Sequence, residues 1–148
     1  MTGVESGLRR RDDVAEALPQ RAMSLTTLFF QRSQLKVSRP EAGVLRAVAD
    51  RPQRVTDLAA AEGLTQPAIT RLVDRLQDRG WIIRRSDPSD LRVVLVALTP
   101  AGERFWQRLR LEYRAFLHEE VAALDDGDVE ALGQAVEVLD RLIARLRK

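Results

Sequence analysis

Two short helical patterns joined by a tight turn in the middle of the chain limit the possible folds more than any other feature. Residues 56–62 have the composition of a two-turn helix, and Gly63 follows where a helix commonly ends in a left-handed conformation. Thr65 then stands at a capping position for a second helix over residues 66–79, with Pro67 in its first turn. Spacings of three and four residues give that helix a single apolar stripe, made of Ile69, Leu72, Val73 and Leu76. This combination is typical of a helix-turn-helix.

The other face of the second helix carries side chains that suit DNA bases. An α-helix fits the major groove, where Arg71 can bond to O6 and N7 of guanine and Gln66 to adenine. Thr70 can contact a thymine methyl group or a phosphate, and the helix N-terminus offers free N–H groups to a phosphate. We therefore predict a DNA-binding surface formed by Thr65, Gln66, Pro67, Ala68, Thr70, Arg71 and Arg75. The alternative is a solvated polar face on an ordinary amphipathic helix.

A β-hairpin is predicted directly after this helix. Residues 81–85 pass from apolar to basic side chains, residues 92–98 are rich in β-branched side chains, and residues 86–91 have the composition of a turn. A hairpin in this place is a wing, whose arginines can enter a narrow minor groove. We predict that Arg84, Arg85, Ser86, Asp90 and Arg92 form the wing site, with Asp90 holding a guanidinium in place rather than touching DNA. A solvated hairpin with an incidental Arg–Asp pair is the alternative.

Helical patterns flank this central region on both sides. Residues 1–12 are expected to form a flexible arm, and apolar residues at helical spacing predict a helix over residues 13–36, interrupted and restarted at Pro19. Ser38 and Glu41 have the spacing of a capping box, which predicts another helix start. A long helix is predicted after residues 99–100, and a last helix carries a heptad seam that requires a partner helix in the same chain or in another copy: Val129, Leu132, Val136, Leu139, Ile143 and Leu146.

Composition excludes several classes of function. The chain has no cysteine and one histidine, so disulfides, zinc–thiolate sites and cysteine-based redox sensing are excluded, and we predict no metal and no cofactor. No apolar run is long enough to cross a membrane and no signal segment begins the chain, which predicts a cytoplasmic protein with no membrane partner.

Charge is unevenly distributed along the chain. The formal net charge is only +2, but residues 117–140 contain eight acidic and no basic residues. The rest of the chain is therefore strongly basic, and 22 of its basic residues are arginines. Such segregation suits a basic face directed at an anionic polymer, although solvated helix faces give weaker versions of it and codon bias gives the same preference for arginine.

The sequence resembles the MarR-type winged-helix transcriptional regulators. The resemblance is carried densely by residues 37–104, in segments that include residues 57–59, 63–68, 70–76, 79–82, 87–88, 90–92 and 98–102, together with Arg84. It implies a mainly α fold, an α+β winged helix with a two-stranded wing. Residues 37–100 would form the DNA-binding lobe, and residues 13–36 and 101–148 the dimerisation helices of one domain over residues 13–148. Arg54 and Leu91 depart from the family's pattern, at a helix cap and at the wing tip.

The resemblance also implies a function and partners. Members bind double-stranded DNA as homodimers, with the second helix in the major groove and the wing in the minor groove, so a repressor on a pseudo-palindromic operator is expected. Many respond to small aromatic ligands, for which the candidate pocket residues here are Phe29, Phe30, Trp106, Arg110 and Tyr113. Plain core packing is the alternative for these aromatic residues. A winged-helix adaptor that does not bind DNA is the alternative function, and no poised acid–base pair indicates an enzyme.

Overall fold

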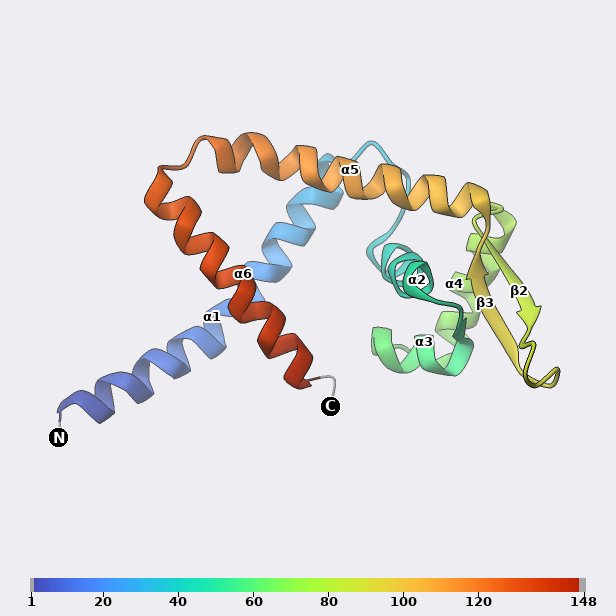
Figure 1. Cartoon of the computed structure of the whole chain (residues 1–148), viewed down its shortest axis with the longest axis horizontal. Helices are drawn as coiled ribbons and strands as arrows, with labels where there is room; N and C mark the ends of the chain where they lie inside the picture. The colour runs from blue at the N-terminus through green and yellow to red at the C-terminus, as the bar shows by residue number, and fades with distance from the viewer. Residues whose placement is uncertain (1, 147–148) are drawn as a thin grey trace. The chain divides into compact units, whose positions relative to one another are not determined.

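The computed structural model describes the backbone of residues 2–146 and the side chains of residues 9–146. In these residues six helices and three short strands follow one another in the order α1, α2, β1, α3, α4, β2, β3, α5, α6 (Figure 1). The chain divides into two compact units, residues 1–110 and residues 111–148. The first contains the helix-turn-helix and the wing, so the mainly α winged-helix fold predicted from the sequence is confirmed.

Helix α1 (Thr2–Arg32) differs from the prediction in two ways. Residues 2–12, where we expected a flexible arm, are helical, and the helix continues through Pro19 instead of restarting there. A proline inside a helix removes one hydrogen bond and crowds the preceding turn, but strong helix formers such as Ala15, Leu18 and Ala22 surround Pro19. Local propensity on both sides therefore outweighs a single interruption.

Helix α2 (Arg39–Asp50) begins with the predicted capping box. The backbone N–H of Ser38 donates to Glu41 Oε2 over 2.8 Å, and the N–H of Glu41 donates back to Ser38 Oγ over 3.4 Å. The helix buries Val44, Leu45 and Val48 in the core of the lobe. The cap therefore fixes the start of a helix whose apolar face supports the helix-turn-helix.

The helix-turn-helix consists of α3 (Val55–Glu62) and α4 (Gln66–Asp78). Gly63 has φ of +62°, the left-handed conformation expected at the end of α3, and the N–H of Leu64 bonds to the carbonyl of Ala59 over 3.0 Å. Arg54 occupies the N-cap of α3 without a side-chain bond to it. The predicted stripe of α4 is confirmed, because Ile69, Leu72, Val73 and Leu76 are all buried.

The wing is part of a three-stranded antiparallel sheet in the order β1-β3-β2. Strand β2 (Ile82–Ser86) pairs with β3 (Val94–Leu98), from the pair Ile82–Leu98 at the base to the pair Ser86–Val94 near the tip. Strand β1 (Gln53–Arg54) pairs with the other edge of β3. The sequence predicted only two strands. A polar segment of two residues has no periodicity of its own and becomes a strand only through its partner.

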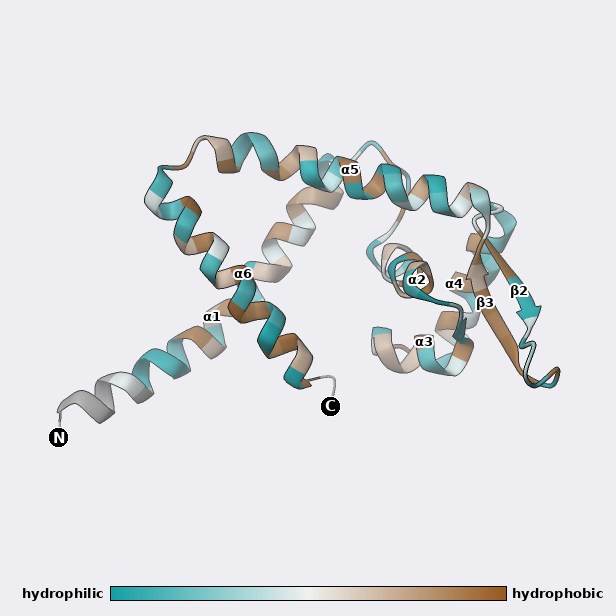
Figure 2. Ribbon diagram, in the orientation of Figure 1, coloured by the Kyte–Doolittle hydropathy of each residue, from teal (hydrophilic) through white to brown (hydrophobic). Residues whose placement is uncertain are grey.

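Helices α5 (Pro100–Ala122) and α6 (Asp126–Leu146) complete the chain. Thr99 Oγ1 accepts the N–H of Gly102 over 3.0 Å and so caps α5, while Asp125 Oδ1 accepts the N–H of Asp128 over 2.8 Å and caps α6. Apolar residues recur along α6, yet none of its residues is buried (Figure 2). No helix among the described residues is both long enough and apolar enough to cross a membrane.

Candidate nucleic-acid interface

The exposed face of α4 holds the first group of predicted DNA contacts. Thr65 is the N-cap residue, and its hydroxyl accepts the N–H of Ala68 over 3.4 Å. Gln66, Pro67 and Arg71 are exposed beside it, because the buried stripe directs the apolar side of the helix into the lobe. The N-terminal half of α4 therefore presents small and polar side chains, but Pro67 has no N–H and Thr65 already caps that of Ala68, so the N–H of Gln66 alone is left without a partner among those of residues 66–69.

The predicted residues on α4 differ in how far they are engaged inside the protein. Gln66 and Arg71 make no side-chain hydrogen bond or ion pair with any described residue, so both are available to a ligand. Thr70, by contrast, donates its hydroxyl to the carbonyl of Gln66 over 2.9 Å. Arg75 donates Nε to Glu41 Oε1 over 3.3 Å. Of the residues predicted to contact bases, Gln66 and Arg71 therefore have side chains without internal partners, while Thr70 and Arg75 are already bonded within the protein.

A buried carboxylate joins α2 to the C-terminal half of α4. Glu41 is only 4% exposed, and its Oε2 lies 3.9 Å from Nη1 of Arg79, in addition to the bond from Arg75. Burial raises the pKa of Glu41. Hydrogen bonds from Ser38 and the guanidinium groups of Arg79 and Arg75 lower it by more than burial raises it, so the pKa of Glu41 lies below the ordinary value. Glu41 is therefore a charged partner that holds α4 against α2. From sequence spacing alone, Glu41 is predictable only as part of the capping box.

The tip of the wing is ordered by two aspartates. Asp87 Oδ1 accepts the N–H of Ser89 over 2.8 Å, and Ser89 Oγ donates to the same oxygen over 2.6 Å. Asp90 accepts Nε of Arg92 on Oδ1 over 3.0 Å and Nη2 on Oδ2 over 3.2 Å. The Arg92 guanidinium holds the pKa of Asp90 below its usual value, and bonds from Ser89 do the same for Asp87. The predicted pairing of Asp90 with Arg92 is present, and Arg92 remains 91% exposed.

The remaining wing residues separate into bound and free groups. Arg84 bonds through Nη2 to Asp74 Oδ1 over 2.6 Å and through Nη1 to Gln77 Oε1 over 2.7 Å. Arg85 and Ser86 are exposed and make no side-chain hydrogen bond with a described residue. Of the three, Arg84 alone is engaged by α4. Arg84 was predicted to belong to the DNA site, and its two partners could not be predicted from the sequence, because their distance from Arg84 follows from the packing of β2 on α4.

An aromatic stack connects the end of the helix-turn-helix to the start of α5. The rings of Trp81 and Phe105 lie 3.7 Å apart between centroids at an angle of 16°, and the guanidinium of Arg79 lies 4.9 Å from the centroid of Trp81. A Cβ atom on Gly102 would overlap the carbonyl oxygen of Trp81. The first turn of α5 can therefore approach the lobe only because residue 102 has no side chain.

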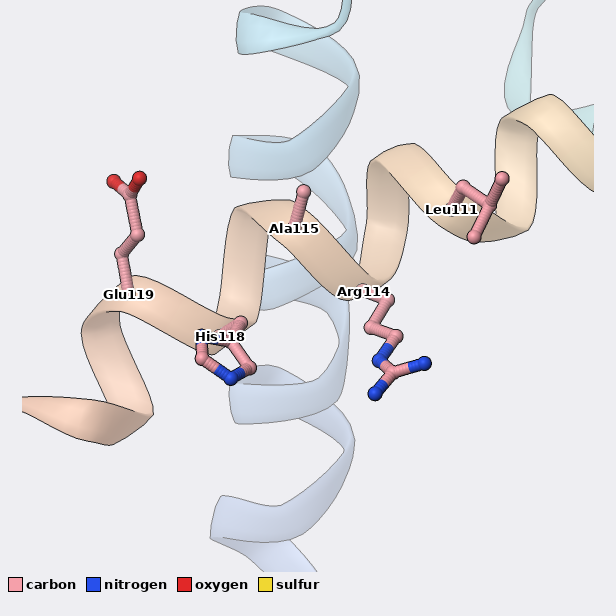
Figure 3. Close-up of a pocket in the computed structure, with 5 residues that line it drawn as sticks. All are labelled: Leu111, Arg114, Ala115, His118 and Glu119. Carbon is pink, nitrogen blue, oxygen red and sulfur yellow. The ribbon is translucent and has the colours of Figure 1, made fainter.

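The predicted ligand-binding residues lie in both units of the chain. Phe29 is buried and packs edge-on against Phe30 at 5.2 Å, Trp106 and Tyr113 are half-buried, and Arg110 is exposed. None of them lines the open hollow along the second part of α5, which is formed by Leu111, Arg114, Ala115, His118 and Glu119. There Arg114 and His118 project from one side of the helix and Glu119 from the other (Figure 3). Their polar ends do not converge on one point, as a ligand site would require.

Comparison with known proteins places these elements in a family. The model of the MarR family matches residues 35–92, the segment that contains the capping box of α2, the helix-turn-helix and the wing tip. This segment of the chain is similar to the MarR family of transcriptional regulators. Because the matched segment includes both groups of predicted DNA contacts, the resemblance stated from the sequence is confirmed.

Individual MarR relatives match over different shares of their length. The uncharacterized HTH-type transcriptional regulator YpoP of Bacillus subtilis is 25% identical over 107 residues, which cover 72% of this chain and 76% of YpoP. The transcriptional repressor MprA of Escherichia coli is 31% identical over 91 residues, 62% of this chain but only 50% of MprA.

Solved structures show the same fold over nearly the whole chain. A MarR family protein from Bacillus stearothermophilus has a TM-score of 0.77 at 19% identity, covering 92% of this chain and 96% of the other. NadR in complex with 4-hydroxyphenylacetate has a TM-score of 0.73 at 24% identity, covering 91% and 92%. YpoP is named as a transcriptional regulator and MprA as a transcriptional repressor, which agrees with the prediction that the chain is not an enzyme.

Proposed function

We propose that this chain is a MarR-type repressor that binds a pseudo-palindromic operator as a homodimer. The observation that carries the proposal is the availability of Gln66 and Arg71 on α4 together with Arg92 on the wing of the same lobe. Arg92 is exposed yet held by two bonds to Asp90, so little of its freedom is left to lose on binding. Arg92 is thus an exposed cation that is already ordered, and Arg71 is an exposed cation with no internal partner. Both suit an anionic partner.

On α4 the proposal assigns recognition of bases to the side chains without internal partners. Arg71 would bond to O6 and N7 of a guanine, and Gln66 to N6 and N7 of an adenine. Thr65, Pro67 and Ala68 would let a phosphate approach the N-terminus of the helix, since their small side chains leave the N–H of Gln66 accessible. Because Arg75 is bonded to Glu41, it would contribute charge near the phosphates more than a base contact.

On the wing the proposal assigns the minor groove to Arg92. The guanidinium would enter a narrow A·T-rich groove, where the negative potential is strongest, while Asp90 sets its direction. Arg85 and Ser86, exposed at the tip-proximal end of β2, would contact the sugar–phosphate backbone.

Dimer formation would use the terminal helices. Val129, Leu132, Val136 and Ile143 of the predicted seam are 40–56% exposed, although they recur at a heptad spacing. Leu25 and Leu28 of α1 are similarly exposed. A second copy of the chain would cover these residues, and two-fold symmetry would then place two α4 helices on half-sites about 10 base pairs apart.

The test is a binding titration on DNA. A labelled palindromic fragment from the region upstream of its own gene, or one selected from a random pool, would be titrated alongside a scrambled fragment at several salt concentrations. We expect tighter binding to the palindrome at every salt concentration, with affinity for both fragments falling as salt rises. Equal affinity for both fragments throughout would contradict the proposal and favour the adaptor function instead.

A small aromatic acid is the proposed releasing ligand. The support is the fold shared with NadR, whose structure contains 4-hydroxyphenylacetate, and the presence of Phe29, Phe30, Trp106, Arg110 and Tyr113 on α1 and α5. A cation beside aromatic rings suits a carboxylate joined to a ring. Adding 4-hydroxyphenylacetate to the protein–DNA complex is expected to lower the affinity for the palindrome, and Arg110→Ala to abolish that response while leaving DNA binding intact.

A further inference from the structure

Arg84 connects the wing to the helix-turn-helix through two hydrogen bonds. Its Nη2 donates to Asp74 Oδ1 over 2.6 Å and its Nη1 to Gln77 Oε1 over 2.7 Å. We propose that Arg84 is a positioning residue that fixes the wing against α4, so that both elements meet DNA as one body. The inference rests on the proposed function, since it concerns how the same DNA surface is held in shape. We call Asp74, Gln77 and Arg84 the α4–wing bridge.

The geometry of the α4–wing bridge follows from both secondary structures. Asp74 and Gln77 are three residues apart on α4, so their side chains are neighbours on one face of the helix. The planar guanidinium of Arg84 presents its N–H groups as a fork, which can bond to two acceptors at once. Along β2, Ile82 and Arg84 share one face of the strand; Ile82 is 2% exposed in the core. Arg84 thus lies on the inner face of the wing.

The position of Arg84 along the hairpin lets the α4–wing bridge fix the direction of the outer half of the wing. Arg84 pairs in register with Val96, which is fully buried, at the middle of the β2–β3 ladder. Toward the tip, Arg85, Ser86 and Val94 are exposed, and none of them has a described side-chain hydrogen bond to α4. The bridge is therefore the last polar tie between α4 and the hairpin before the tip that carries Arg92.

The engagement of Arg84 also argues against a direct phosphate contact. Its side chain is 29% exposed, whereas that of Arg92 is 91% exposed. A phosphate would have to displace Asp74, which lies close and carries a full negative charge. Two models therefore predict opposite effects of removing Asp74. If Arg84 contacts phosphate, loss of its competitor raises the affinity for DNA; if Arg84 positions the wing, the same loss lowers it.

The test compares Asp74→Ala with Asp78→Ala. Asp78 lies on the same helix, is exposed and has no described side-chain hydrogen bond or ion pair, so it controls for the loss of one negative charge near DNA. We expect Asp74→Ala and Arg84→Ala each to weaken binding to the palindrome about threefold to tenfold, and the double variant no more than either one. Asp78→Ala is expected to bind as well as the unaltered protein or slightly better. Tighter binding by Asp74→Ala would overturn the inference.

Two further measurements distinguish a positioning role of Arg84 from a general loss of folding and from a direct contact between Arg84 and phosphate. The slope of log affinity against log salt is expected to stay unchanged in Arg84→Ala, because Arg84 makes no phosphate contact and Arg92 is retained. A slope reduced by about one would instead identify a phosphate contact. The thermal unfolding midpoint is expected to match that of the unaltered protein closely, because a pair this exposed adds little stability.

A measurement without DNA keeps the inference independent of the proposed function. Hydrogen exchange of the amides in β2 and β3 is expected to speed up in Asp74→Ala and Arg84→Ala relative to Asp78→Ala, because the hairpin loses its tie to α4. If the unaltered protein binds no DNA sequence preferentially, the proposed function fails while faster exchange still supports the bridge. Unchanged exchange in both variants would refute the bridge, whatever the DNA results.

Discussion

At the scale of single residues, the arginines of the lobe differ in what holds them. Arg71 has no described partner, Arg92 is oriented by Asp90, Arg84 is bonded to α4, and Arg75 is bonded to buried Glu41. The sequence assigns all four to DNA because each lies at a suitable position along the chain. Only the described contacts divide them into free, oriented and positioning groups, and the expected effects of substitution differ accordingly.

Arg71→Ala is expected to reduce discrimination between the operator and variants of it by about 1–3 kcal/mol, through loss of contacts to one guanine. Arg92→Ala is expected to weaken binding evenly across sequences and to reduce the salt slope by about one, because it removes a backbone or groove charge. Both are measured by fluorescence anisotropy against a panel of single-base variants. An unchanged sequence preference in Arg71→Ala would remove that side chain from the recognition surface.

Glu41 gives the protein a predictable response to acid. Its pKa in the folded state lies below the ordinary value of 4.5, so the carboxylate contributes its full stabilisation above that value and loses it as the pH falls through the folded-state pKa. Glu41→Gln is expected to cost about 1–3 kcal/mol at neutral pH and less at a pH below the folded-state pKa of Glu41, since the neutral acid no longer holds Arg75 and Arg79. Urea unfolding at both pH values measures this, with the exposed Glu16→Gln as control. An equal cost at both pH values would contradict the assignment.

At the scale of elements, close packing at the start of α5 holds the lobe to that helix. Trp81 stacks on Phe105, and the N–H of Thr99 bonds to the Trp81 carbonyl over 3.0 Å. These contacts lie where the chain leaves β3 and enters α5, and they depend on the missing side chain of Gly102. The junction therefore has little room to adjust.

Gly102→Ala is expected to destabilise the protein by about 1–3 kcal/mol, because the added Cβ overlaps a backbone oxygen that cannot move away cheaply. Gly133→Ala in α6 is the matched control, since a Cβ there meets nothing within 4 Å. It is expected to leave stability unchanged or raise it by about 0.5–1 kcal/mol through helix propensity. The two variants are compared by urea unfolding. Equal stability would show that α5 can shift away from Trp81.

At the scale of the whole molecule, α6 is a helix with an apolar seam and no buried residue. If a second copy covers this seam, then Leu132→Glu combined with Val136→Glu is expected to weaken the dimer at least about tenfold, since each change places a charge in an apolar contact. Gln134→Glu, on the opposite face of α6, is the control. Light scattering after size-exclusion chromatography measures the mass. A monomer in the unaltered protein, or a dimer unaffected by both substitutions, would contradict the proposed assembly.

The sequence alone determined the elements whose signals are local. The capping box of Ser38 and Glu41, the left-handed Gly63 and the buried stripe of α4 depend on residues a few positions apart, so spacing was sufficient to predict them. The two hairpin strands and the pairing of Asp90 with Arg92 were predictable for the same reason. The continuous helix through Pro19 was not, because the sequence shows the interruption but not the balance of propensities around it.

Only the tertiary structure decided the contacts between elements. Strand β1 exists because β3 pairs with it, and the partners of Arg75 and Arg84 come from elements that sequence spacing does not bring together. Such contacts depend on how helices and strands pack, and packing is a property of the folded core rather than of any short segment. The resemblance to the family and the winged helix were thus recognisable from the sequence, while only the fold shows which arginines are bonded to other elements and which are free of such partners.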